Sequence, residues 1–252
     1  MVASLALALS VPACSDDSPR SSESGDAQVK QTGDSGSHGE FPPVYADAGA
    51  QDASKPLPQP VTSALIRAAD PSTDHVSALG ASNRAFAFDL YHQLALVSDG
   101  QNLLFSPLSI STALAMTYAG ASGTTASEMK SALHFDLPQA QLHEAFNATD
   151  LALASRGRGL VGADGTPFRI NVNNALWSQS NAQYPVVPSF LDTLALDYGA
   201  GLFQLDFEHA PEAARGSING WVAEKTEQLI PELLPAASVD SLTRFVLTNT
   251  VY

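Results

Sequence analysis

The chain has very little cysteine, with Cys14 as the single example among 252 residues. One cysteine cannot form an intrachain disulfide, and it cannot supply the several thiolates of a structural metal site. The six histidines offer no substitute. No two of them are spaced four residues apart, and His143-Glu144 lacks the second histidine of a zinc-protease helix. The sequence therefore predicts no disulfide, no metal site and no other cofactor.

Positive charge is also scarce. The chain holds 12 Lys and Arg against 26 Asp and Glu, which gives a formal net charge of −14. A nucleic-acid surface needs clustered Lys and Arg that displace counterions, and an anionic membrane surface attracts a similar basic patch. Neither half of the sequence contains such a cluster. We therefore predict no nucleic-acid partner and no direct binding to a membrane surface.

An apolar period is missing from the segment between residue 15 and residue 76, which is rich in Ser, Gly, Asp, Gln and Pro. Such a composition buries too little surface to offset the entropy lost on ordering. We predict a disordered tether over residues 14–76 and a folded domain over residues 77–252.

Residues 1–13 (MVASLALALSVPA) form a short apolar run that is too short to span a bilayer as a helix. The run resembles the end of a bacterial lipoprotein signal peptide, with residues 11–13 at the cleavage positions and Cys14 as the lipidated residue. It departs from that pattern at Pro12 and in having no Lys or Arg before the run. The alternative is a plain secretory signal with an incidental cysteine. Both interpretations predict a location outside the cell or on the cell envelope, and membrane contact only through a lipid anchor.

The folded part alternates between helical and strand periods. Two short motifs predict helix starts. Ser106-Pro107 pairs an N-cap with a proline at the first helical position. Thr125–Glu128 has the spacing of a capping box. Ser82 is a further candidate N-cap. The periods predict helices over 82–97, 108–119, 125–133, 139–154, 186–198 and 212–230, and strands over 168–176, 201–207 and 243–252. This order indicates an α+β domain.

Catalytic motifs give no argument for an enzyme. Gly33-Asp34-Ser35-Gly36 matches the tetrapeptide around a chymotrypsin-type nucleophile, but it falls in the predicted tether with no strand or oxyanion loop beside it. Chance accounts for that match. A hydrolase that uses Ser35 would require an activity that Ser35→Ala abolishes. No P-loop and no dinucleotide glycine fingerprint occurs.

Six segments in order resemble the N-terminal part of a serpin. The most specific stretch is residues 102–135, in which the helix start Ser106-Pro107 precedes a helix of small residues and a glycine-rich break. All six segments follow the family's order of helices and main-sheet strands. They are residues 82–94, 105–110 (FSPLSI), 125–135, 173–177 (NNALW), 218–222 (INGWV) and 246–252 (VLTNTVY). By this resemblance the chain is the N-terminal part of a serpin of bacterial origin, with a lipoprotein-like signal and a tether in front.

The resemblance implies a serpin fold, with N-terminal helices and part of the large central β-sheet. It implies inhibition of a target serine protease, with cysteine proteases as a further target class, by cleavage of a reactive loop and its insertion into the main sheet. The polar cluster beneath the opening sheet, called the shutter, would comprise Ser106, Pro107, Ser109 and Asn249. A simpler interpretation makes Ser106 an N-cap alone and Asn249 an ordinary strand residue.

The sequence stops at Tyr252, before the family's reactive loop. We therefore expect a fragment of a longer protein, with an unpaired edge on the strand at 243–252 and part of its core uncovered. Gln228 stands where the family usually has a glycine, at the end of the helix that crosses the sheet. The alternative function is that of a non-inhibitory serpin, which acts as a binding or structural module at the cell surface.

Overall fold

The computed structural model describes the backbone of residues 3–10 and most of residues 58–251. Within the second range it leaves out 99, 157, 164, 166–169 and 181–184. The side chains of residues 3–10 are outside this description. Cys14 and Ser35, together with the remaining residues of the predicted signal and most of the predicted tether, lie outside the described residues.

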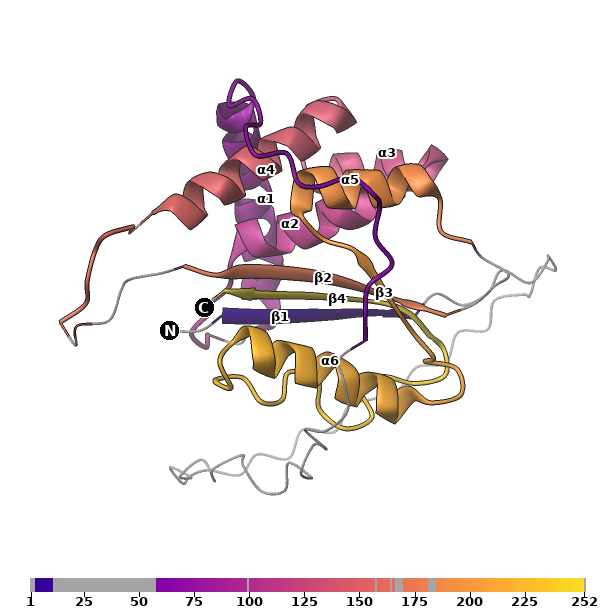
Figure 1. Cartoon of the computed structure of the whole chain (residues 1–252). Helices are drawn as coiled ribbons and strands as arrows, with labels where there is room; N and C mark the ends of the chain where they lie inside the picture. The colour runs from indigo at the N-terminus through magenta and orange to yellow at the C-terminus, as the bar shows by residue number, and fades with distance from the viewer. Residues whose placement is uncertain are drawn as a thin grey trace, which may run out of the picture.

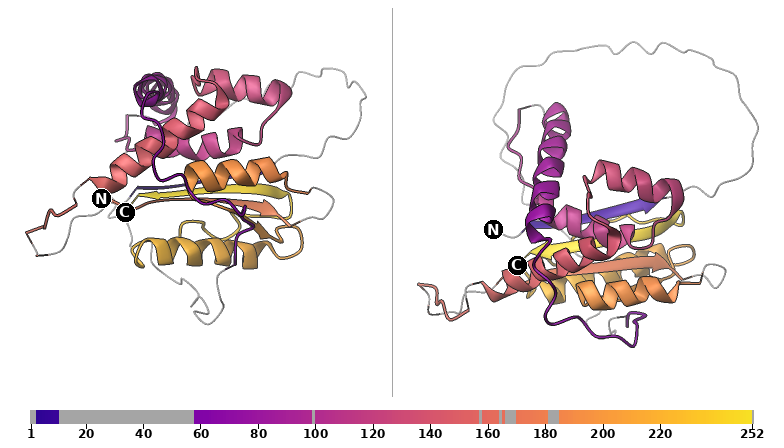
Figure 2. Two further views of the ribbon diagram at one scale, coloured as in Figure 1. Left: turned by 45° about the horizontal axis from the view of Figure 1, so that its top comes forward. Right: turned by 90° about the horizontal axis from the view of Figure 1, so that it is seen from above.

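The described part forms three layers, which Figure 1 shows from the side. A four-stranded sheet lies in the middle with helices on both of its faces, as the views in Figure 2 also show. The helices above the sheet are α1 (Val76–Val97), α2 (Pro107–Tyr118), α3 (Gly123–Ala132), α4 (Gln139–Ser155) and α5 (Pro188–Tyr198), and the helix below it is α6 (Pro211–Lys225). Helices and a mixed sheet in one chain confirm the predicted α+β class.

The sheet has the order β1-β4-β2-β3. Its strands are β1 (Ala3–Ser10), β2 (Val172–Gln179), β3 (Leu202–Leu205) and β4 (Thr243–Val251). β4 is central and pairs antiparallel with β2 on one side and with β1 on the other, whereas β3 runs parallel to β2. The edge that we expected to find unpaired on residues 243–252 is therefore covered, because β1 lies along it.

Aromatic packing joins the sheet to α6. Trp177 on β2 stacks on Phe203 of β3 with ring centroids 4.3 Å apart, and Trp221 of α6 meets Trp177 edge-on at 5.7 Å. All three side chains are buried. Offset and edge-on pairs of this kind add about 1 kcal/mol each to the effect of burial. A second apolar cluster joins α1, α2 and α4, with Phe135 and Phe146 at its centre.

Three helix ends differ from the sequence prediction. α1 begins at Val76, so Ser82 lies buried inside the helix and is not its N-cap. α3 begins at Gly123, so Thr125 is inside it and the capping box predicted at Thr125–Glu128 is wrong. α6 ends at Lys225 and not at residue 230, because the chain turns there: Gln228 has a φ of 65°, a left-handed conformation that a glycine adopts without strain.

The last part of the predicted tether packs on the domain. Val61 forms a β-bridge with Leu202, and the Arg67 guanidinium donates to Asp150 at 2.7 Å and to Asn147 at 2.8 Å. These contacts are made by polar side chains or by the backbone. They require no periodic apolar residues, so hydrophobic periodicity in the sequence could not predict them. Residues 58–75 thus contribute to the folded domain, whereas the sequence placed its beginning at residue 77.

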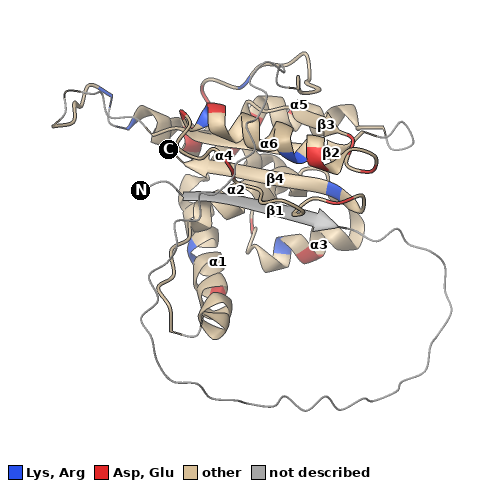
Figure 3. Cartoon of the chain, turned by 90° about the horizontal axis from the view of Figure 1, so that it is seen from below, with Lys and Arg blue, Asp and Glu red and all other residues tan. Residues whose placement is uncertain are grey.

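Apolar side chains near the C-terminal end of α1 remain exposed, with Leu96 and Val97 each close to 80% exposed. In the view of Figure 3, the positions of Lys and Arg are scattered along the ribbon and form no stripe. Among the described residues, no helix is both long and apolar enough to cross a membrane.

A buried histidine joins α4 to α5. His143 is only 3% exposed, and its Nδ1 lies 2.7 Å from the Tyr198 hydroxyl. Burial lowers the pKa of His143 from 6.5 to about 4. Nearby, the pKa of Asp197 is raised from 3.8 to about 6, mainly by burial and also by the Glu144 carboxylate, against the opposing effect of the Arg67 charge.

We predict that His143 makes the free energy of unfolding fall as the pH drops from 6.5 to 4. In this range the unfolded chain takes up a proton on His143 and the folded chain does not, which costs at most about 3 kcal/mol. Asp197 acts in the opposite direction, because as the pH falls below 6 the folded chain binds a proton there before the unfolded chain does. Both proteins contain Asp197, so its effect cancels when they are compared. His143→Gln should therefore gain stability relative to the parent chain as the pH falls.

Urea unfolding at pH 7, 5.5 and 4.5, followed by tryptophan fluorescence, measures this difference. His92→Gln serves as the matched control, because His92 is exposed on α1. A difference between His143→Gln and the parent chain that stays constant across the three pH values would contradict the assignment.

Candidate functional site

The start of α2 is fixed by local chemistry. Ser106 is the N-cap in an extended conformation, and its Oγ accepts the Ser109 N–H at 3.3 Å. Pro107 occupies the first helical turn, where its missing N–H leaves no helical hydrogen bond unmade. The sequence prediction for this helix start is confirmed.

Small residues let α2 lie close against the sheet. Seven of its twelve residues are buried, and five of these are Ser, Thr or Ala, among them Ser109, Ser111 and Ala115. Ser111 Oγ has no hydrogen-bond partner among the described residues, although it is fully buried. A buried hydroxyl without a partner costs about 1–3 kcal/mol, so the α2 face holds a donor that another group could satisfy.

Asn249 lies on the face of β4 that is turned toward α2 and α5. Its neighbours on this face are Leu247 and Phe245, and Phe245 packs in the cluster that contains Met116 of α2. The Asn249 side chain is 99% buried and its Nδ2 donates to Asn174 Oδ1 of β2 at 2.6 Å. A buried amide is therefore paired across the β2–β4 ladder, in the middle of the site.

The opposite face of β4 carries two more polar contacts with β2. Trp177 Nε1 donates to Thr248 Oγ1 at 3.0 Å, and Asn173 Nδ2 donates to Thr250 Oγ1 at 3.3 Å. Thr248 and Thr250 are both buried. Three consecutive residues of β4 thus use their side chains, as well as their backbone, to hold β2.

The structure brings the predicted shutter residues together only in part. Ser106 and Ser109 line a cavity of about 240 Å³ beneath the ends of β2 and β4, where Val172 and Val251 form its other wall. Asn249 is not among the lining residues, and no hydrogen bond is described between Asn249 and either serine. The sequence missed Asn174, Thr248 and Thr250, because cross-strand partners are separated by about seventy residues in the chain.

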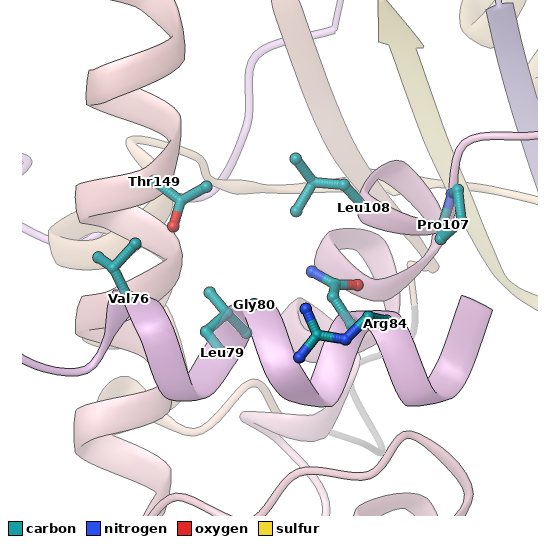
Figure 4. A pocket seen from close by; sticks show the side chains of 8 residues that line it. Val76, Leu79, Gly80, Arg84, Pro107, Leu108 and Thr149 are labelled. Carbon is teal, nitrogen blue, oxygen red and sulfur yellow. The ribbon is translucent and has the colours of Figure 1, made fainter. Parts of the chain in front are cut away.

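A second pocket, of about 390 Å³, lies on the other side of the α2 start, between α1, α2 and α4. Figure 4 shows Pro107 and Leu108 of α2 facing Leu79 and Gly80 of α1 across it, with Thr149 of α4 at one end. Leu108 and Thr149 line both pockets. The first turn of α2 therefore lies between two spaces, and it is less tightly enclosed than the rest of the helix.

The electrostatics of the site are nearly neutral. Asp150 lines the smaller cavity, but it is paired with Arg67 at 2.7 Å. No group of three or more His, Cys, Asp or Glu that could hold a metal ion is present in the described part of the chain. The chemistry available here is hydrogen bonding between neutral side chains and strands.

Comparison with known proteins gives consistent results over this part of the chain. A family model described as "Serpin (serine protease inhibitor)" matches residues 81–252. Leukocyte elastase inhibitor A of Rattus norvegicus is 38% identical over 174 residues, and leukocyte elastase inhibitor of Homo sapiens is 35% identical over 174 residues. In both cases the match covers 69% of this chain and 43% of the relative, so the chain spans less than half the length of these relatives.

Solved structures show the same likeness in three dimensions. Ovalbumin from emu (Dromaius novaehollandiae) superposes with a TM-score of 0.59 at 26% identity, covering 69% of this chain and 46% of that one. Cleaved kallistatin complexed with heparin superposes with a TM-score of 0.58 at 27% identity, covering 70% and 49%. These matches confirm the predicted fold for the helices and the partial sheet.

We predict that Asn249→Ala lowers the free energy of unfolding by about 1–3 kcal/mol, because it leaves the Asn174 carbonyl oxygen without its donor. In a double-mutant cycle with Asn174→Ala, the two substitutions should couple by about 1 kcal/mol. Urea unfolding measures all four proteins. Asn102→Ala, at an exposed loop position, is the control and should change stability by less than about 0.5 kcal/mol. Purely additive effects would show that the amide pair contributes nothing to the β2–β4 contact.

Proposed function

The chain belongs to the serpin family, and from that premise we propose that it supplies the sheet-opening part of an inhibitor of serine proteases. Serpins are protease inhibitors and not enzymes. In the proposed mechanism a target protease cleaves an exposed loop, and the loop then adds to the main sheet as a new strand. That loop belongs to the part of the relatives' length for which this chain has no counterpart.

The observation that carries the proposal is the pairing of β4. One edge of this strand is held by β2 through backbone and side-chain contacts, and the other edge is paired with a strand from outside the matched domain. An extended peptide adds to a sheet through main-chain hydrogen bonds along such an edge. The antiparallel pairing of β1 with β4 supports the proposal that this edge accepts a strand in that orientation.

The predicted shutter has a physical role in this proposal. When a strand enters beside β4, the groups beneath the sheet must shift without leaving buried polar atoms unpaired. Asn249 and Ser109 are buried, and Ser106 and Ser109 border a cavity that gives them room to move. Amide and hydroxyl groups suit this role, because each can donate and accept. Pro107 keeps the start of α2 in place while they exchange partners.

The test of this function begins with the coding sequence beyond the codon for Tyr252. The product of the whole reading frame is incubated with an elastase-type serine protease and examined by denaturing gel electrophoresis. We predict a covalent complex that survives denaturation, in about one-to-one stoichiometry. Cleavage of the loop without a complex would contradict inhibition and favour the alternative, a non-inhibitory binding module. A stop codon directly after Tyr252 would contradict the proposal for this chain.

For location, we propose export to the cell envelope and lipidation at Cys14, which would leave the domain on a tether. The support is the apolar run at residues 1–13, the cysteine that follows it and the polar composition of the next sixty residues. A flexible chain of this length has a root-mean-square reach of about 40 Å, enough to hold the domain clear of a membrane. The target protease would then be met outside the cell.

We predict that Cys14→Ser abolishes lipid attachment and releases the protein from the membrane fraction of a bacterial host. Metabolic labelling with a fatty-acid analogue and fractionation measure both effects. Ser15→Ala, at the next position, is the matched control and should keep the label. Equal labelling of the Cys14→Ser protein would exclude Cys14 as the modified residue, and absence of label from the parent chain would favour a plain secretory signal.

A further inference from the structure

The outer edge of β4 is occupied along its whole length by residues 3–10. The register runs antiparallel from Ala3 opposite Val251 to Ser10 opposite Thr243, with one irregularity between Leu9 and Ser10. These residues lie outside the range 81–252 that matches the serpin family. The domain therefore has its edge covered by a strand that does not belong to the family's own fold.

The sequence of this segment suits the position. Residues 3–10 read ASLALALS, so leucine alternates with a small residue, which is the period of a strand. The register places Leu7 opposite Leu247 and Leu9 opposite Phe245, two residues on the α2 and α5 face of the sheet. Paired residues of antiparallel strands share a face, so two of the three leucines occupy register positions where β4 itself is apolar, and the third, Leu5, is opposite Asn249.

We propose that residues 3–10 are a latch: an intramolecular occupant of the β4 edge that excludes any other extended peptide until it is removed. The proposal rests on the proposed function, because the peptide that the latch excludes is the inserting loop. Cleavage before Cys14, as proposed above, would remove the latch together with the rest of residues 1–13. Export and the opening of the strand-acceptor edge would then be one event.

Exclusion follows from backbone geometry. An edge offers one row of N–H and C=O groups, and a second strand cannot use groups that β1 already bonds. Because β1 is part of the same chain, its pairing does not depend on protein concentration, whereas a separate peptide must compete by mass action. The apparent affinity for such a peptide falls in proportion to the fraction of molecules with an open edge.

The experiment compares two proteins, both with Cys14→Ser: residues 1–252, and a chain that begins at residue 14. The probe is a fluorescein-labelled peptide with the sequence of residues 3–10 and two added lysines for solubility. Fluorescence anisotropy should show binding to the shortened chain and at least about tenfold weaker binding to the full chain. The same peptide with proline at the positions of Ala6 and Leu7 should bind neither.

A second pair of variants tests the latch within the full chain. Ala6→Pro with Leu7→Pro removes at least one ladder N–H, because successive residues of a strand point their N–H groups to opposite sides. This double variant should bind the probe like the shortened chain. Ala6→Thr with Leu7→Val keeps strand propensity and should bind it as weakly as the parent.

Equal binding of the probe to the full and shortened chains, or no binding to either, would overturn the latch. A shortened chain that does not fold, judged by tryptophan fluorescence and its unfolding transition, would overturn it as well, since β1 would then be a permanent strand. The protease assay is independent of these results. A covalent protease complex without a difference in probe binding would leave inhibition standing and remove the latch alone.

Discussion

The structure depends on the fact that a β-strand has two edges, each of which presents backbone groups that need partners when they are buried. β4 is the strand for which this matters, because it lies inside the described sheet and six of its nine residues are buried. β2 pairs with residues 245–251 along one edge, and three hydrogen bonds between side chains reinforce that ladder. Along the other edge β4 has a backbone ladder to β1.

The packing of the helices bears on the proposed function. α2 packs on the β4–β2 face through small residues, and the cavities on either side of its first turn leave that region less enclosed than the core around Trp177 and Trp221. Under the proposal that the sheet accepts a strand, it would need one rigid pair of strands and one adaptable side. The aromatic cluster with α6 would stiffen the β2–β3 side, and the neutral polar groups near α2 would exchange hydrogen bonds at low cost.

Local chemistry made much of the fold predictable. The start of α2 at Ser106-Pro107 and the periods of β3 and β4 depend on residues close together in the sequence, and these predictions are confirmed. The strand predicted over 168–176 is shifted along the chain, because β2 runs from Val172 to Gln179 and residues 168–169 lie outside the described residues. Non-local pairing was not predictable. Residues 3–10 read as an apolar leader, because the strand that pairs with them lies more than two hundred residues away. The bond from Asn249 to Asn174 crosses seventy-five residues and was not predicted; the grouping of Asn249 with Ser106 and Ser109 came from the family resemblance.

Residue-resolved amide hydrogen exchange along β4 tests the central claim most directly. The account predicts two alternating sets among residues 243–251, since successive N–H groups of a strand point to opposite neighbours. The set bonded to β2 should exchange only through global unfolding, and the set bonded to β1 should exchange faster, through release of that one strand. Uniform protection of all the amides, or faster exchange on the β2 side, would contradict a strand with one fixed edge and one exchangeable edge.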